Sequence, residues 1–200
     1  MIVSALSYSS SDPTLDQQLV ALRYSGADVF VNATTGKFSA MSIRKAGELK
    51  WKPLQIASTS NLSLKNVLVP AGVENAEGII SLVNYKDPSD PKIANDQDVQ
   101  AYFDFMKEYL PNDDAKDSSF VGGYAGAQLA TYILRKCGED LTRDNVLKQA
   151  TTLSNPPIGM LVEGVTISTS PDNYLPFESA RLVRFDGAKW NIFDQPVKMK

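Results

Sequence analysis

The sequence predicts an α/β protein, and three patterns in its amino-terminal part support this prediction. Leucines at helical spacing over 15–22 are followed by a short apolar run, ADVFV, at 27–31. An amphipathic pattern over 36–49 then leads into a second strand-like run, PLQIAST, at 53–59. Helices that alternate with short apolar strands are typical of a parallel sheet covered by helices.

The first helix is expected to begin at Ser11-Asp12-Pro13. Asp12 can cap the first turn, and Pro13 suits the first helical position, where its missing N–H has no partner to lose. Gly26 suits the left-handed residue that ends such a helix. The ADVFV run that follows is of the kind found in parallel strands that are buried on both faces.

Residues 36–49 are expected to form the helix of a β-α-β unit. Apolar side chains recur on roughly one face of this helix, at Phe38, Met41, Ala46 and Leu49. Together with the flanking strands, residues 27–59 then make a right-handed unit. Ligand contacts in such units lie just beyond the carboxyl ends of the strands, here at residues 32–36 and 57–60.

The chain changes character near residue 70. GIISLVNY at 78–85 runs into the turn-rich KDPSDPK, which indicates a crossing between structural halves. Three helices are then expected, over about 96–110, 118–136 and 142–150. The tail predicts antiparallel strands, because 159–169 and 177–185 alternate apolar and polar residues and Asp186-Gly187 is a hairpin signal.

Composition excludes several classes of function. The 20 basic and 23 acidic residues give a net charge of −3 without a block of like charge, which disfavours nucleic acid as a partner. Histidine is absent and Cys137 is the only cysteine, so His-dependent triads, internal disulfides and thiolate metal cages are excluded. Cys137 is expected to be a buried, unreactive thiol. We find no signal-peptide pattern and no apolar run of about 18 residues.

Two glycine-containing motifs do not match nucleotide sites. Gly36-Lys37 lacks the earlier glycine and the following Ser or Thr that a phosphate loop needs. The GGYAG motif at 122–126 does not match the dinucleotide fingerprint, and we expect its glycines to let a helix pack closely against a neighbour. Acidic pairs such as Asp113-Asp114 are interpreted as solvated or capping groups. No catalytic residue, metal site or cofactor is therefore expected.

Hydroxyl side chains follow both strands of the β-α-β unit: Thr34 and Thr35 after the first strand, Ser58 and Thr59 after the second. The carboxyl ends of neighbouring parallel strands meet at one edge of a sheet, so we expect these side chains to converge in one crevice. Uncharged hydroxyls can orient a small polar ligand by hydrogen bonds. The sequence therefore predicts a ligand-binding site rather than a catalytic site.

Several segments resemble, in their order along the chain, those of a known family. They are SYSSSDPTLDQQLVALRYSGADVFV, the IRKAG helix end, GVENAEGIISLVNYKDPSDP, YAGAQLATYILRKCG and VTISTSPDNYLPFESARLVRFDGAKWNIF. Together they resemble the type I periplasmic solute-binding proteins of ABC transporters, in the Leu/Ile/Val-binding group. The resemblance implies two three-layer αβα lobes joined by three crossings, of which this chain carries the carboxyl-terminal part.

The resemblance also implies a division of the chain. Residues 1–69 correspond to a β-α-β segment of the second lobe, residues 70–155 to the mainly helical completion of the first lobe, and residues 156–200 to the final crossing with antiparallel strands. The helix over 118–136 is apolar on more than one face. It would need cover, either from a second copy through self-association or from the rest of a longer protein.

The implied function is capture of a small molecule between two lobes in the periplasm and its delivery to an ABC transporter permease, without enzyme activity. In amino-acid-binding members, an acidic residue at the position of Thr59 pairs with the ammonium group of the ligand. Because Thr59 is uncharged, we expect a small polar or aromatic carboxylate or an amino-acid-like compound rather than a simple α-amino acid. Two alternatives remain open: a sensory domain of a receptor with the same fold, and a small α/β enzyme.

Overall fold

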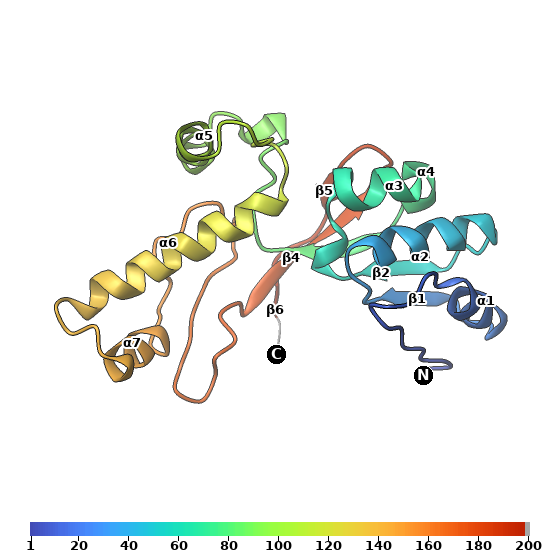
Figure 1. Cartoon of the computed structure of the whole chain (residues 1–200), viewed down its shortest axis with the longest axis horizontal. Helices are drawn as coiled ribbons and strands as arrows, with labels where there is room; N and C mark the ends of the chain where they lie inside the picture. Colours follow the sequence, from blue (N-terminus) through green and yellow to red (C-terminus); the bar gives the residue numbers. More distant parts are fainter. Residues whose placement is uncertain (199–200) are drawn as a thin grey trace. The chain divides into compact units, whose positions relative to one another are not determined.

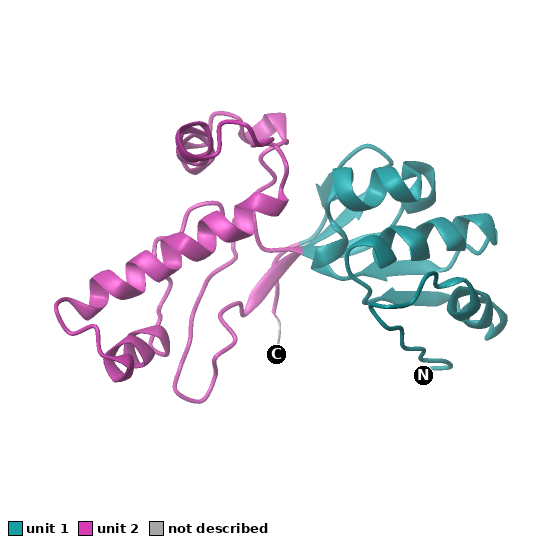
Figure 2. Ribbon diagram, viewed as in Figure 1, with its two compact units in different colours: residues 1–82, 182–194 teal, residues 83–181, 195–200 magenta. Residues whose placement is uncertain are grey.

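The structure is a computed structural model, and it describes residues 1–198 (Figure 1). The chain divides into two compact units (Figure 2). Unit 1 consists of Met1–Leu82 and Leu182–Asp194, and unit 2 consists of Val83–Arg181 with the described residues from Gln195 onward. The chain therefore passes three times between the units, after residues 82, 181 and 194.

Unit 1 is built on the predicted β-α-β unit. Its first elements are α1 (Asp16–Tyr24), β1 (Val29–Asn32), α2 (Lys37–Glu48) and β2 (Leu54–Ala57). β1 and β2 are parallel, with Val29 opposite Leu54 and Asn32 opposite Ala57, and β3 (Ile80–Val83) continues the parallel sheet beside β2. Between β2 and β3 lie four short helical elements: η1 (Thr59–Asn61), η2 (Leu64–Leu68), α3 (Val69–Ala71) and α4 (Val73–Ala76).

The core of unit 1 lies on one face of this sheet. Figure 1 shows α2, α3 and α4 on the same side of β1 and β2, and the core beneath them includes the fully buried Ile43 and Leu68. The order β1-β2-β3 explains this arrangement, because right-handed crossovers that step in one direction all lie on one face of a sheet. The opposite face is exposed at four apolar side chains: Val29, Val31, Leu54 and Ile56.

This exposed face corrects one prediction. The ADVFV run was expected to be buried on both faces, but β1 alternates between exposed and buried residues. Phe30 is 7% exposed, whereas Val31 is 67% exposed. The apolar run therefore predicts the strand, but no helix of the described residues covers the face on which Val31 lies.

The start of α1 corrects a second prediction. The helix begins at Asp16, and Leu15 rather than Asp12 occupies the N-cap position. The carboxylate of Asp12 accepts a hydrogen bond from the backbone N–H of Ser9 at 2.8 Å, and Asp12 N–H in turn donates to Ser9 O at 3.0 Å. Asp12 thus closes a turn with preceding residues instead of capping the helix that follows. The end of α1 agrees with the sequence, since Gly26 has φ of +76°.

Unit 2 contains the three predicted helices: α5 (Gln97–Tyr109), α6 (Ser119–Cys137) and α7 (Arg143–Ala150). Asp96 caps α5 and Thr142 caps α7 through their side chains. One apolar cluster joins α5, α6 and Met160, and a second joins α6 to the segment around Ile158 and Ile167. Cys137 is buried, as predicted.

The glycines of the GGYAG motif at 122–126 were predicted to let α6 pack closely against a neighbour, and the space around each glycine tests this. A Cβ atom placed on Gly122 would lie 3.8 Å from the ring of Tyr85, which is ordinary contact. Gly123 and Gly126 have no atom within 4 Å of such a Cβ among the described residues. The prediction is therefore wrong for Gly123 and Gly126, because these two residues lie on an exposed face of α6.

The tail forms part of the predicted antiparallel structure. β4 (Ser179–Phe185) pairs antiparallel with β5 (Trp190–Ile192) and with β6 (Val197–Lys198). The turn between β4 and β5 contains Gly187 with φ of +94°, as the Asp-Gly signal predicts. A strand was predicted over residues 159–169, but the structure does not form one there. These residues make isolated antiparallel bridges, for example between Tyr85 and Leu161.

Candidate ligand-binding site

The carboxyl ends of β1 and β2 lie side by side in unit 1. Asn32 is opposite Ala57 in the parallel ladder, and Ser58 N–H donates to Asn32 O at 3.0 Å. The loop after β1 leads into α2, and the loop after β2 leads into η1. The structure therefore brings the two predicted pairs of hydroxyl residues to one edge of the sheet.

Thr34 and Thr35 occupy the loop after β1. The half-buried Thr34 donates its Oγ1 hydroxyl to Asn32 Oδ1 at 2.7 Å, and its backbone N–H lies 3.2 Å from the same oxygen. Thr35 is exposed, and its N–H donates to Tyr8 Oη at 3.2 Å. Tyr8 comes from the segment before α1, and its ring packs 4.8 Å from that of Phe38, centroid to centroid.

Ser58 and Thr59 occupy the loop after β2. The Ser58 hydroxyl is 2.7 Å from the Ser60 hydroxyl. Thr59 is exposed, and its hydroxyl has no hydrogen-bond partner within the described part of the chain. Among the described residues, no side-chain hydrogen bond joins the two threonines after β1 to this pair. The four side chains share an edge, and their assignment to a ligand site stays a prediction.

Four buried polar residues other than the four predicted hydroxyl residues lie beneath this edge: Asn32, which falls in the predicted contact range 32–36, and Ser39, Ser42 and Asn61, which do not fall in either predicted range. Asn32 Nδ2 donates to Ser42 Oγ at 2.8 Å, and Asn61 Nδ2 donates to Asn32 O at 3.2 Å. Ser39 Oγ contacts Asn61 Oδ1. The sequence pattern could have indicated that Ser39 and Ser42 are buried, because both serines fall on the same face of α2 as its apolar residues. Small polar residues there indicate a buried polar network.

The site carries no acidic side chain among the described residues at the two strand ends. Lys37 lies at the first position of α2, with its ammonium group 4.8 Å from the centroid of the Phe38 ring. The amino end of a helix carries partial positive charge. The electrostatics of this edge are therefore neutral to positive, which suits hydroxyl, carbonyl or carboxylate groups of a ligand better than an ammonium group.

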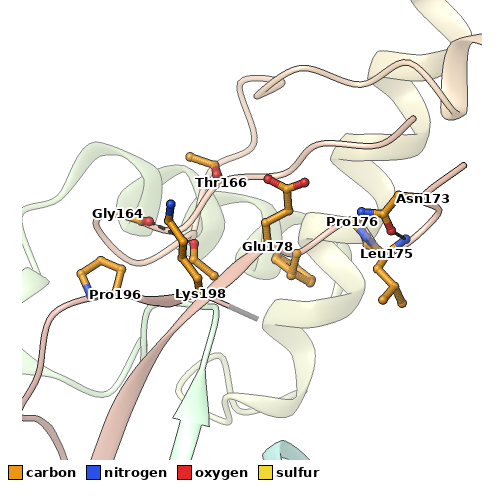
Figure 3. Close-up of a pocket in the computed structure, with 10 residues that line it drawn as sticks. Gly164, Thr166, Asn173, Leu175, Pro176, Glu178, Pro196 and Lys198 are labelled. Carbon is orange, nitrogen blue, oxygen red and sulfur yellow. Dashed lines mark hydrogen bonds between the residues drawn. The ribbon is translucent and has the colours of Figure 1, made fainter. Parts of the chain in front are cut away.

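A separate pocket lies within unit 2, beside β4 and β6 (Figure 3). Its volume is about 840 Å³, and its wall includes Leu175, Phe177 and Pro196. Figure 3 shows Glu178 and Lys198 at this pocket, and both are exposed residues. Their carboxylate and ammonium groups form no ion pair with each other. Ser179 is a buried polar residue of its wall, but the Ser179 hydroxyl donates to Gly164 O at 3.2 Å, so its proton is already used and does not orient a ligand.

Residues 2–188 match the family model described as periplasmic binding protein. This match covers most of the chain. The chain belongs to the periplasmic binding protein family. The predicted resemblance is thus confirmed, and so is the α/β fold of this family. Among curated proteins, none matches the sequence.

Solved structures of binding proteins share the fold at low sequence identity. A branched-chain amino acid ABC transporter protein from Thermus thermophilus, with bound valine, has a TM-score of 0.78 and 16% identity, covering 97% of this chain and 52% of that chain. A substrate-binding periplasmic protein from Ralstonia solanacearum has a TM-score of 0.78 and 14% identity; the match covers 94% of this chain and 51% of that chain. A solute-binding protein from R. palustris, in complex with 4-hydroxybenzoate, has a TM-score of 0.72 and 14% identity; the match covers 98% of this chain and 52% of that chain.

This periplasmic binding protein chain spans about half the length of the structural neighbours that it matches. The family and these neighbours are solute-binding proteins rather than enzymes, in agreement with the prediction of no catalytic activity. The family is one of extracytoplasmic proteins. Across the described residues, no helix has the length and apolar character needed to cross a membrane.

Proposed function

We propose that this periplasmic binding protein captures a small solute in the periplasm and delivers it to the permease of an ABC importer. The observation that carries the proposal is the family match over residues 2–188, together with the uncharged polar edge at the ends of β1 and β2. Thr34, Thr35, Ser58 and Thr59 are the proposed ligand-binding residues. An importer is favoured over a sensory receptor because neighbours are named as ABC transporter proteins.

The proposed ligand is a small polar or aromatic carboxylate or an amino-acid-like compound, rather than a simple α-amino acid. A buried ammonium group without a paired anion is costly, and Thr59 and its neighbours offer no anion. The neighbour from R. palustris holds 4-hydroxybenzoate, whereas the neighbour from Thermus thermophilus holds valine. Both compounds are therefore suitable probes.

The proposal extends to the arrangement of the chain in the whole protein. Residues 1–69 would contribute to the second lobe together with residues 70–82, which belong to the same compact unit; residues 83–155 would complete the first lobe, and the tail would form the last crossing. Three passages of the chain between compact units suit a hinge motion that accompanies ligand capture. Contacts that a ligand makes only in the closed state would drive that motion.

Calorimetric titration of the whole protein with 4-hydroxybenzoate and with valine tests this function. We expect Thr34→Ala and Thr59→Ala each to weaken binding of the carboxylate probe by about 1 kcal/mol or more, because a buried ligand group loses its hydrogen bond. Thr131→Ala, on an exposed turn of α6 in unit 2, is the matched control. Tight binding of valine would contradict the ligand class, and unchanged affinity after replacement of all four hydroxyl residues would contradict the site.

A further inference from the structure

A network of buried hydrogen bonds underlies the candidate site. Its four members are almost fully shielded from solvent: Asn32 is 1% exposed, Ser39 0%, Ser42 0% and Asn61 1%. Polar groups are costly to bury unless their hydrogen bonds are made. When these bonds are made, such a network restricts geometry more strictly than apolar packing does.

The network joins the two loops of the site. Asn61, which ends η1 two residues after Thr59, donates from Nδ2 to the carbonyl of Asn32, the last residue of β1. Its Oδ1 contacts the hydroxyl of Ser39 in the first turn of α2, and that hydroxyl also lies 3.0 Å from Thr34 O. The loop after β1 and the loop after β2 are therefore both bonded to Ser39 and Asn61.

The network also fixes the direction of the hydrogen bond at Thr34. Ser42 donates its single hydroxyl proton to Ser39 O at 2.9 Å, so its Oγ acts as acceptor for Asn32 Nδ2. The amide of Asn32 is thereby oriented with Oδ1 toward Thr34, where it accepts both the N–H and the hydroxyl of that residue. The hydroxyl proton of Thr34 is thus used, and only its lone pairs remain for a ligand.

We propose that Asn32, Ser39, Ser42 and Asn61 are positioning residues of the ligand site, which fix the spacing of its two loops and present Thr34 as a hydrogen-bond acceptor. The ligand would then place a hydroxyl or N–H donor against Thr34. This proposal rests on the proposed function for the identity of the site. The positioning itself can be tested without any ligand.

Hydrogen exchange of backbone amides in the chain tests the positioning role. We expect Ser39→Ala to speed exchange about tenfold or more in both 33–36 and 58–60, because the link between the loops is lost. Ser81→Ala is the matched control. Ser81 is also buried and its hydroxyl donates to Ala57 O at 2.9 Å, but it lies outside the network. It should leave residues 33–36 unchanged.

Equal exchange at residues 33–36 in the two variants would overturn the positioning role. If Ser39→Ala does not fold, Asn61→Asp replaces it in the same measurement. This variant keeps the acceptor for Ser39 but removes the donor to Asn32 O. Loosening of both loops supports the proposal, and protection equal to that of the unaltered chain contradicts it.

Calorimetry of the whole protein with 4-hydroxybenzoate and benzoate tests the acceptor role of Thr34. We expect the hydroxylated probe to bind about tenfold more tightly, Thr34→Val to remove this preference, and Thr34→Ser to keep it. Equal affinity for both probes in the unaltered protein would overturn the acceptor role. Absence of binding by either probe would count against the proposed ligand class instead, while hydrogen exchange would still decide the positioning role.

Discussion

At the scale of single residues, Lys86 fixes the start of α5. Its Nζ lies 2.8 Å from Asp96 Oδ2 and 2.9 Å from Asp98 Oδ2. The hydrogen bond from Lys86 lowers the pKa of Asp96, which also accepts the backbone N–H groups of Asp98 and Val99. Burial acts to lower the pKa of Lys86, but its hydrogen bonds to the two carboxylates outweigh burial and raise it.

Replacement of Lys86 by Met is expected to lower the free energy of unfolding by about 1 kcal/mol at pH 7. Because the pKa of Asp96 is lowered by folding, its ionised carboxylate stabilises the folded chain at pH values above the pKa of the unfolded state, near 4. This stabilisation is lost as the pH falls through the pKa of the folded state. The difference between Lys86→Met and the unaltered chain should therefore shrink below about pH 4. Urea unfolding at pH 7 and pH 3 measures this difference in the free energy of unfolding, and Lys92→Met, at an exposed lysine, is the control. A difference that does not depend on pH would contradict the role of this ion pair.

Tyr102 is a buried residue whose hydroxyl has no hydrogen-bond partner among the described residues. Burial, together with the negative charges of Asp117 and Asp114, raises the pKa of Tyr102 to about 12. Because a hydroxyl without a partner gains nothing from burial, Tyr102→Phe should leave stability at pH 7 unchanged or raise it by up to about 1 kcal/mol.

The same variant has a predicted alkaline phenotype. Because the pKa of Tyr102 is raised by folding, its neutral phenol stabilises the folded chain at pH values below the pKa of the unfolded state, near 10. This stabilisation is lost as the pH rises from there toward 12, the pKa of the folded state. Tyr102→Phe should therefore lose less stability than the unaltered chain between these two pH values. Thermal unfolding followed by circular dichroism measures both effects, and clear destabilisation at pH 7 would show that the hydroxyl has a partner.

At the scale of elements, Gly164 lets the segment before β4 approach the segment that leads into β6. Gly164 has φ of +82°, and a Cβ atom at this position would lie 2.5 Å from Cγ of Pro196. Its carbonyl accepts the Ser179 hydroxyl at 3.2 Å, and Ser179 pairs with Lys198 in the ladder of β4 and β6. A side chain at Gly164 would therefore disturb the pairing of these strands.

Gly164→Ala is expected to destabilise the chain by about 2 kcal/mol, from both the positive φ and the contact with Pro196. Gly187→Ala is the matched control. Gly187 also has a positive φ, of +94°, but apart from its chain neighbours no atom of the residues that the structure describes lies within 4 Å of a Cβ at this position. It should cost only about 1 kcal/mol. Equal losses in the two variants, measured by urea unfolding, would show that Pro196 moves aside without cost.

At the scale of the whole molecule, the chain leaves an apolar sheet face exposed in unit 1. Val31 and Ile56 are directly opposite each other on this face and are 67% and 39% exposed. Parallel sheets are normally covered on both faces, and exposed apolar patches mark surfaces that associate. We therefore expect the purified chain to self-associate as its concentration rises.

Light scattering coupled to size exclusion measures this association. Val31→Asp should weaken it, because a charge on the exposed face opposes apolar contact. Val69→Asp is the control, since Val69 is 59% exposed but lies on α3, away from that face. A chain that stays monomeric at all concentrations, or that associates equally in both variants, would show that this face is not responsible.

The sequence predicted the local elements of this periplasmic binding protein well, for reasons visible in particular residues. Asp96 and Thr142 lie at the predicted starts of two helices and cap α5 and α7, and Gly26 and Gly187 adopt the left-handed backbone that their turns require. Capping and turn chemistry act over a few neighbouring residues, so they can be read from sequence. Asp12 is the exception, because Ser9 competes for its carboxylate.

The candidate site could be predicted only in outline. The strand ends placed Thr34 and Thr59 at one edge of the sheet, because parallel strands of a β-α-β unit end together. The network of Asn32, Ser39 and Asn61 was not predicted, since these residues lie up to 29 positions apart and their hydrogen bonds depend on how α2 and η1 pack. Contacts of that kind have no local signature.

The sequence by itself determined the α/β class, the order of helices and strands and the membership of the periplasmic binding protein family, because periodicity, caps and turns are local properties of the chain. Only the tertiary structure decided which face of the sheet is covered. Val31 and Phe30 are both apolar members of one run, yet one is exposed and the other buried. The order β1-β2-β3 places the two crossovers between these strands on one face, and that order is a property of the folded chain alone.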